Sequence, residues 1–309
     1  MHILFLFMDG LGLGEDDPSA NPFAARGFRA MERLARDQRW LLNMQPVREE
    51  RLVFVPLDAN LGIEGLPQSG TGQATLFTGI NCAEIAGRHY GPYPHSKTKP
   101  VIAEMNLFRQ LDDRYPSEEQ PGAFANAYPD KFFEYVKKTD RWTVTTRCCL
   151  ASRTRIRGSE DLKQGIAIPA DIVGRRWPEP IEEGVMPGSE FAAAERLTRI
   201  AAEHKLTLFE YYLTDKAGHR QSMEAAKEVL GSLDRFVGAL LQHLDRADLL
   251  LLLTSDHGNL EDLNTKSHTR NAVPLAVLGA GASAFRDARS LTDVTPALMT
   301  IATQASGSF

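Results

Sequence analysis

Short, unbroken apolar runs alternate with longer amphipathic segments along most of this chain. The clearest amphipathic segment has a three-four spacing of apolar residues, at Met223, Ala226, Leu230, Leu233, Val237, Leu240 and Leu244. This spacing gives a helix one buried stripe, whereas an apolar run of six or so residues is typical of a buried strand. The runs predict strands at 3–8, 52–57, 206–213, 248–254 and 273–278. The amphipathic segments predict helices at about 21–38, 72–80, 98–112, 189–204, 220–245 and 292–303.

Alternation of strands and helices predicts an α/β fold, a mostly parallel sheet with helices on both faces. The middle of the chain is less regular. Residues 123–128 read as a further strand, and a short helix is expected around 130–137. Residues 138–187 are rich in Arg, Thr, Gly and Pro and have no clean period. We therefore expect a catalytic core of residues 1–137 and 188–309, with 138–187 as a small inserted cap.

Charge and composition narrow the possible partners. The 309 residues carry a formal net charge of −5, which argues against nucleic acid or an anionic membrane surface as the partner. An anionic small substrate stays possible, because bound cations would reverse the local charge. No apolar run approaches the ~20 residues of a spanning helix, and the apolar residues 1–8 have no basic segment before them, so we read them as a strand. Three cysteines without a C-x-x-C spacing favour free thiols and a cytoplasmic protein.

Acidic residues and histidines gather where the predicted strands end. The carboxyl ends of parallel strands are where open α/β sheets keep their active sites. Carboxylates and imidazoles together suit a divalent metal, and a set of this size suits two ions better than one. Each motif alone has a plainer reading, such as a helix cap, an Asx turn or a solvated histidine. The residues are Asp9, Asp215, His219, Asp256, His257 and His268.

Two glycine-containing loops offer other chemistry. Gly10, Gly12 and Gly14 do not match the dinucleotide fingerprint, because the third glycine comes one residue early and no helix start follows. Residues 67–75 carry hydroxyls ahead of a predicted helix, but the loop lacks the lysine of a phosphate-binding P-loop. A hydroxyl at a helix start suits an anion or a nucleophile that accepts a phosphoryl group, and it equally suits a simple N-cap.

Taken together, these motifs resemble the alkaline phosphatase superfamily, in particular its cofactor-independent phosphoglycerate mutases and phosphopentomutases. The resemblance covers about residues 1–80 and 205–309. It rests on five motifs in order, namely Phe7 to Gly10, residues 67–79, Thr214 to Arg220, Thr254 to Asn259, and Ser267 to Thr269 with Val273 to Leu275.

The resemblance implies two divalent metal ions, with Mn²⁺ favoured and Zn²⁺ possible. One ion is expected on Asp215, His219 and His268, and the other on Asp9, Asp256 and His257. It also implies a nucleophilic hydroxyl about ten residues before a Thr-Gly pair that closes the helix. That spacing selects Ser69, which lies ten residues before Gly79, with Thr71 as the second choice.

The implied activity is phosphoryl transfer on a small phosphorylated substrate through a phosphoserine. We expect a phosphomonoester hydrolase rather than a mutase, because the stretch between Ser69 and Asp215 is shorter than the inserted domains of the mutases and because Gln73 stands where they carry a histidine. A phosphomutase and a phosphodiesterase are the alternatives, and a non-catalytic metal-binding protein is a further one. Arginine binds phosphate bidentately, so we expect substrate contacts from Arg88, His89, Arg147 and Arg153.

Overall fold

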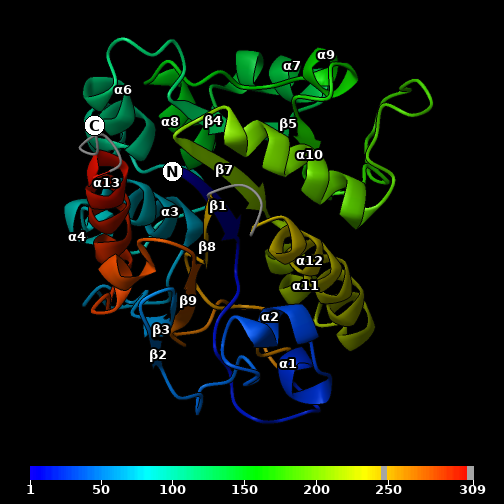
Figure 1. The fold of residues 1–309 in the computed structure, drawn as a ribbon. Helices are drawn as coiled ribbons and strands as arrows, with labels where there is room; N and C mark the ends of the chain where they lie inside the picture. Colours follow the sequence, from blue (N-terminus) through cyan, green and yellow to red (C-terminus); the bar gives the residue numbers. More distant parts are fainter. Residues whose placement is uncertain (245–248, 305–309) are drawn as a thin grey trace.

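The computed structural model describes residues 1–244 and 249–304. Its centre is a seven-stranded sheet in the order β2-β3-β9-β8-β1-β7-β4 (Figure 1). The strands are β1 (His2–Met8), β2 (Val47–Arg48), β3 (Leu52–Leu57), β4 (Gly122–Phe124), β7 (Leu206–Tyr211), β8 (Leu249–Thr254) and β9 (Val273–Leu278). β8, β1, β7 and β4 are parallel, while β9 runs antiparallel to both β8 and β3. The predicted α/β class with a largely parallel sheet is confirmed.

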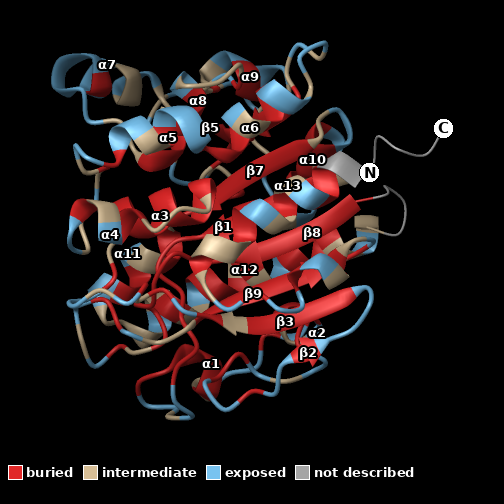
Figure 2. Cartoon of the chain, turned by 90° about the vertical axis from the view of Figure 1, so that its left-hand side faces the viewer, coloured by how far each residue is buried: buried red, intermediate tan, exposed pale blue. Residues whose placement is uncertain are grey.

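The central strands are apolar throughout because both faces of the sheet are covered. Phe5 of β1 lies between Leu208 of β7 and Leu252 of β8 in the sheet, and all three side chains are fully buried. Alternate residues of a strand point to opposite faces, so a strand covered on both sides needs a continuous apolar run rather than an alternating one. Figure 2 shows the result, with buried strands between helices whose outer surfaces are exposed.

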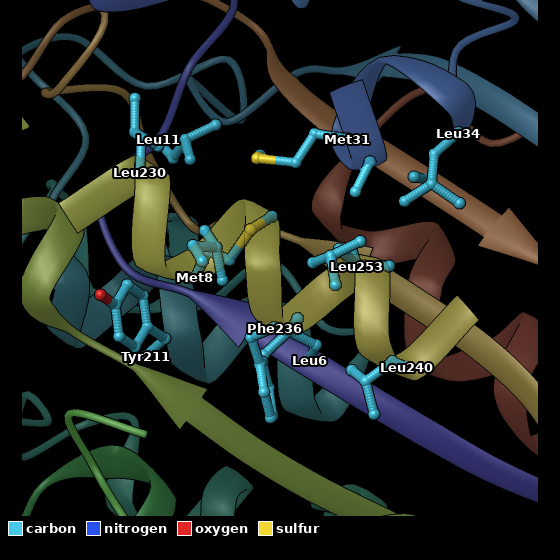
Figure 3. Close-up of a cluster of buried hydrophobic side chains, with 14 of the residues drawn as sticks. Leu6, Met8, Leu11, Met31, Leu34, Tyr211, Leu230, Phe236, Leu240 and Leu253 are labelled. Atoms are coloured by element: carbon cyan, nitrogen blue, oxygen red, sulfur yellow. The ribbon is translucent and has the colours of Figure 1, made fainter. Parts of the chain in front are cut away.

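One face of the sheet packs against α12 (Met223–Leu244), the longest helix of the described residues. Figure 3 shows Leu6 and Met8 of β1 in one cluster of buried side chains with Leu230, Phe236 and Leu240 of this helix. The three-four spacing seen in the sequence is therefore the buried stripe of α12. The same face carries α1 (Pro22–Ala25), α2 (Arg29–Arg33), α10 (Glu190–Ala202) and α11 (Leu213–Arg220).

The opposite face packs against α3 (Ser69–Thr78). Phe77 of α3 meets Phe5 and Phe7 edge to face, with ring centroids 6.0 and 5.4 Å apart. The same core holds side chains of α4 (Cys82–Ala86), α5 (Lys99–Met105), α6 (Leu107–Arg114), α8 (Val144–Leu150), η1 (Ala282–Phe285), η2 (Leu291–Asp293) and α13 (Val294–Gln304).

Residues 138–187 hold α8, α9 (Ser159–Lys163) and β6 (Ile168–Pro169). β6 pairs in parallel with β5 (Asn126–Ala127) to form a separate two-stranded sheet, and α7 (Asp130–Thr139) precedes this region. Val144, Cys148 and Cys149 of α8 lie in the main core. The remainder encloses a small cluster around Leu162 and Ala167. The division into a core and a cap stays a proposal.

Four predicted elements differ from the structure. The helix expected over 21–38 is two short helices, because the chain turns extended at Arg26. The helix expected over 98–112 is interrupted at Asn106, whose side chain caps α6 by accepting from Phe108 N and Arg109 N. The strand expected at 123–128 divides between β4 and β5. The helix expected over 220–245 is preceded by a separate helix, α11, which begins at Leu213 and carries His219. Asp245 and Asp248, at the ends of two other predictions, lie outside the described residues.

All three cysteines, Cys82, Cys148 and Cys149, are free and buried. Burial raises the pKa of the Cys82 thiol to about 11. In the described ranges, no helix combines the length and the apolar character needed to cross a membrane.

Candidate metal centre

The sheet topology brings the predicted ligands to one edge. β8, β1 and β7 are adjacent and parallel, so their carboxyl ends meet. Asp9 follows β1, and Asp256 and His257 follow β8. Asp215 and His219 lie one turn apart on α11, which follows β7. The connection from β8 to β9 supplies His268.

Asp215, His219 and His268 form a first group. Their ligand atoms all lie within 4.8 Å of one another. The His219 Nε2 is 3.3 Å from Asp215 Oδ2, and the His268 Nε2 is 3.6 Å from Asp215 Oδ1. The two Nε2 atoms are 3.4 Å apart. Three donor atoms thus converge on one point, as a metal ion requires.

The two histidines of this group are fixed by their other ring nitrogen. The Nδ1 of His219 lies 2.8 Å from the carbonyl oxygen of Lys266, and the Nδ1 of His268 lies 2.7 Å from that of Pro67. A carbonyl only accepts, so Nδ1 carries the proton and donates it. This leaves the Nε2 lone pair free for a cation, which is the usual arrangement of metal-binding histidines.

A second group surrounds His257, which is fully buried. Its Nε2 lies 3.3 Å from Asp9 Oδ1 and 3.6 Å from Asp256 Oδ2. The three ligand atoms that lie within 4.8 Å of one another belong to Asp9, Asp215 and His257. Asp215 is therefore common to both groups, and Asp256 stands beside the second one. The sequence assigned Asp215 to the first group alone.

The second group has more buried negative charge than the protein neutralises. Asp9 Oδ1 and Asp256 Oδ2 are buried without a hydrogen-bond partner. Burial, followed by repulsion from Asp256, raises the pKa of Asp9 to about 8, outweighing the attraction of His257. Burial also raises the pKa of Asp256. Buried orphan carboxylates beside converging imidazoles fit a divalent cation, which would restore the missing charge.

The pKa values of His257 and His268, whose rings lie against each other, shift in opposite directions. Burial acts to lower the pKa of His257, but the carboxylates of Asp256 and Asp9 raise it to about 10. Burial and the nearby His257 lower the pKa of His268 to about 4. The two rings stack with centroids 3.8 Å apart. The positive charge of the pair is thus held on the ring nearest the two carboxylates.

Ser69 reaches this centre and Thr71 does not. Ser69 is the first residue of α3, and its Oγ lies 2.9 Å from His257 Nε2. The Thr71 hydroxyl accepts from Tyr90 N at 3.1 Å and donates to Gln68 O at 3.3 Å. A cavity of about 360 Å³ opens over Ser69. It is lined by Leu66, Gln68, Ser69, Pro92, Asp215, His219, Ser267 and His268.

The four predicted substrate contacts separate into two pairs. Arg88 and His89 line a neighbouring cavity of about 580 Å³, which shares Leu66 and Gln68 with the first. Arg147 and Arg153 line neither cavity. Arg147 forms an ion pair with Asp140 at 3.2 Å. The Arg153 guanidinium is engaged by the Asp112 carboxylate and by the carbonyl oxygens of residues 112, 115, 116 and 118.

Three polar residues of the site were not predicted. Asn259 donates from Nδ2 to Asp215 Oδ1 at 2.6 Å, and the Glu261 carboxylate accepts from Asn259 N at 2.8 Å. Glu210 lies on β7, where burial followed by repulsion from Asp9 raises its pKa to about 7. The available signal for Glu210 was an acid within an otherwise apolar strand. For the other two it was their place directly after Asp256 and His257.

Comparisons with known proteins agree with this geometry. Residues 180–304 match the model of the metalloenzyme superfamily. The chain is 28% identical over 206 residues to the 2,3-bisphosphoglycerate-independent phosphoglycerate mutase of Pseudomonas fluorescens. This match covers 60% of this chain and 37% of that enzyme. It is 35% identical over 99 residues to the enzyme of the same name from Halobacterium salinarum, 29% of this chain and 20% of that enzyme. The matches thus span well under half the length of each of these two relatives.

Solved structures show the same fold. A cold-active alkaline phosphatase from Shewanella superposes with a TM-score of 0.57 at 12% identity, covering 98% of this chain and 100% of that one. A phosphoglycerate mutase from Leishmania mexicana superposes with a TM-score of 0.51 at 12% identity, covering 97% and 95%.

The fold is that of the alkaline phosphatases, and residues 180–304 are similar to the metalloenzyme superfamily, which agrees with the converging ligand groups. Within that superfamily, the chain resembles the cofactor-independent phosphoglycerate mutases. The converging ligand groups support binding of divalent metal.

Proposed function

We propose that this protein is a metal-dependent phosphohydrolase that cleaves a small phosphomonoester, with Ser69 as the nucleophile. The observation that carries the proposal is the position of the Ser69 hydroxyl. It lies 2.9 Å from His257 Nε2 and lines the same cavity as Asp215, His219 and His268. A nucleophile within hydrogen-bond reach of its activating centre is the arrangement that covalent catalysis requires.

Two divalent ions are part of the proposal. Asp215, His219 and His268 would hold one, and Asp9, Asp256 and His257 the other, with Asp215 between them. When bound, such ions neutralise phosphoryl oxygens and lower the pKa of a hydroxyl group. The mixed oxygen and nitrogen donors suit Mn²⁺, which we favour, and Zn²⁺.

The chain itself supplies the nucleophile and its alignment. Ser69 stands at the positive end of the α3 dipole, which attracts an anionic phosphoryl group. As Ser69 Oγ bonds to phosphorus, the ester P–O bond breaks and the alcohol leaves with a proton. Water then attacks the phosphoserine, the Ser69–phosphorus bond breaks, and inorganic phosphate is released. Leu66 and Gln68 line both the Ser69 cavity and the cavity of Arg88, so we place the remainder of the substrate in the Arg88 cavity.

A phosphomutase is the second candidate, and two observations favour it. The curated relatives reported above are mutases. The second cavity also offers room for an intermediate to turn and accept the phosphoryl group on another hydroxyl. Hydrolysis is favoured because the described residues that line the Ser69 cavity include neither Arg nor Lys to hold a second anionic group there.

Phosphate release from a panel of phosphomonoesters, with Mn²⁺ or Zn²⁺ added, tests the proposal. Ser69→Ala should lower the rate by about 1,000-fold or more, and Thr71→Val, which removes a neighbouring hydroxyl engaged elsewhere, should retain the activity. Mass spectrometry of acid-quenched enzyme should find the phosphoryl group on the peptide with Ser69. Isomerisation of phosphoglycerates or sugar phosphates without phosphate release would establish the mutase instead. Activity that survives in Ser69→Ala would overturn both.

A further inference from the structure

Glu261 occupies an unusual place beside the metal centre. Its side chain is 1% exposed, and no Lys, Arg or His of the described residues forms an ion pair with it. Its carboxylate instead accepts four hydrogen bonds. Oε2 accepts from Gly12 N and Asn259 N, both at 2.8 Å. Oε1 accepts from the Thr269 hydroxyl and, at 3.0 Å, from Asn271 Nδ2.

These donors lie on the two loops that carry predicted metal ligands, namely the loop after β1 and both ends of the long connection from β8 to β9. Gly12 lies on the loop that begins at Asp9, and Asn259 lies two residues after His257. Thr269 directly follows His268. One buried carboxylate therefore joins the loop after β1 to both the start and the end of the β8–β9 connection. Movement of any one loop would break a charge-assisted hydrogen bond.

Asn259 extends the connection to the remaining ligand segment. With its backbone N–H held by Glu261, its side chain donates to Asp215 Oδ1 at 2.6 Å and to Asp215 O at 3.1 Å. Asp215 is the residue common to both ligand groups. The path from Glu261 through Asn259 to Asp215 thus reaches the part of the centre on which both groups depend.

The backbone around Glu261 is shaped to admit this side chain. A Cβ atom at Gly12 or at Gly258 would overlap the Glu261 carboxylate. Glycine at these two positions lets the β1 loop and the β8 turn approach the carboxylate closely enough for direct hydrogen bonds. The glycines and the glutamate therefore form one packed unit.

We propose that Glu261 is a positioning residue that sets the affinity of the centre for divalent metal and, through it, the turnover of phosphoryl transfer. The inference rests on the proposed function for its kinetic consequence only. Glu261 lines neither cavity and contacts no substrate position. It acts by holding the loops that carry Asp9, His257 and His268 in one arrangement and, through Asn259, by holding Asp215 of α11. Hydrogen-bonded partners of metal ligands commonly change metal affinity by about 10- to 100-fold.

The test compares Glu261→Gln with the wild type in Co²⁺ binding, followed by the visible absorption of the bound ion. Glutamine keeps the shape but removes the negative charge and replaces one acceptor oxygen with an NH2 group, which cannot accept from these donors. We expect Co²⁺ affinity to fall by about 10-fold or more, kcat to fall, and KM for p-nitrophenyl phosphate to stay within a factor of two. Thr269→Val removes one donor and leaves Glu261 in place, so it should shift Co²⁺ affinity in the same direction by less.

Asp161→Asn is the matched control, because Asp161 is a buried carboxylate that accepts from Gly158 N at the start of α9, away from the centre. It should lower the melting temperature without changing Co²⁺ affinity. Unchanged Co²⁺ affinity in both Glu261→Gln and Thr269→Val, with a lower melting temperature, would show a purely structural role and overturn the inference. A higher KM with unchanged kcat would overturn it as well, since it would indicate substrate contact. If the wild type binds Co²⁺ but transfers no phosphoryl group, the proposed function fails and the affinity comparison alone decides this inference.

Discussion

Removing metal should make the stability of this protein fall steeply as the pH rises from 6.5 to 8. Two groups in the centre, Asp9 and His257, hold protons in the folded state that they release in the unfolded chain, and Glu210, whose pKa is raised to about 7 by burial, adds a smaller contribution of the same sign. Asp9 has its pKa raised to about 8 by burial and by Asp256. His257 has its pKa raised to about 10 because Asp256 and Asp9 outweigh its burial. In the unfolded chain both pKa values return to the ordinary range, near 4 and 6.5.

The direction and the size of this change in unfolding free energy follow from the protons bound in the folded and unfolded states. Above pH 6.5 the unfolded chain binds fewer protons at these two groups than the folded protein does, so the free energy of unfolding falls as pH rises. Each proton contributes about 1.4 kcal/mol per pH unit. Two protons over this window amount to about 3 to 4 kcal/mol, a large part of the stability of an ordinary domain. His268 acts oppositely, since its pKa is lowered to about 4, but most of its contribution lies below pH 6.5 and only about 0.4 kcal/mol falls within this window.

Urea denaturation followed by circular dichroism, in EDTA at several pH values from 6.5 to 8, measures this slope. Asp9→Asn should remove about half of it and should be more stable than the metal-free wild type at pH 8. Saturating Mn²⁺ should abolish the slope in the wild type, because cations replace the protons. A metal-free stability that is constant or rises across this window would refute the reasoning.

Three further outcomes are expected. Arg88→Ala should raise KM several-fold while changing kcat less, as measured by steady-state kinetics, because Arg88 lines the second cavity rather than the one over Ser69; an effect on kcat alone would contradict this placement. Phe77→Ala should cost about 3 to 5 kcal/mol of unfolding free energy in urea denaturation, since its ring packs on two strand phenylalanines; a loss below about 1 kcal/mol would contradict the packing argument. Cys82, Cys148 and Cys149 should not react with a thiol reagent until the chain unfolds, because burial raises the pKa of each thiol, and rapid labelling of the native protein would show otherwise.

The strands and the ligand cluster could be predicted because their signals are local. An apolar run such as residues 249–253 is typical of a strand in a sheet that is covered on both faces. The residues that follow adjacent parallel strands lie together at the carboxyl edge of the sheet. The convergence of Asp215, His219 and His268 followed from that rule and from the superfamily resemblance. Their roles in metal binding and catalysis stay proposals.

Other features depend on contacts between distant segments, which no local pattern reports. In the sequence, Glu261 is one acidic residue in a polar loop. Its role becomes visible only in the structure, where Gly12 N and the Thr269 hydroxyl donate to its carboxylate. The sequence suggests Arg153 as a phosphate-binding residue. In the structure, its guanidinium contacts the Asp112 carboxylate and nearby carbonyl oxygens. The apolar spacing of residues 21–38 suits one continuous helix. In the structure the chain is extended at Arg26, which separates the two short helices α1 and α2.

The position of β1 has a consequence for how the protein is made. This strand is synthesised long before both of its neighbours in the sheet, because Ile3 lies beside Leu206 on one side and Leu250 on the other. Sheet pairing with such sequence separation is slow, because a long loop must close before any contact forms. During translation the apolar β1 therefore has no neighbouring strand to pair with until β7 and β8 have left the ribosome. A nascent chain in this state is a substrate for chaperones that cover exposed apolar segments.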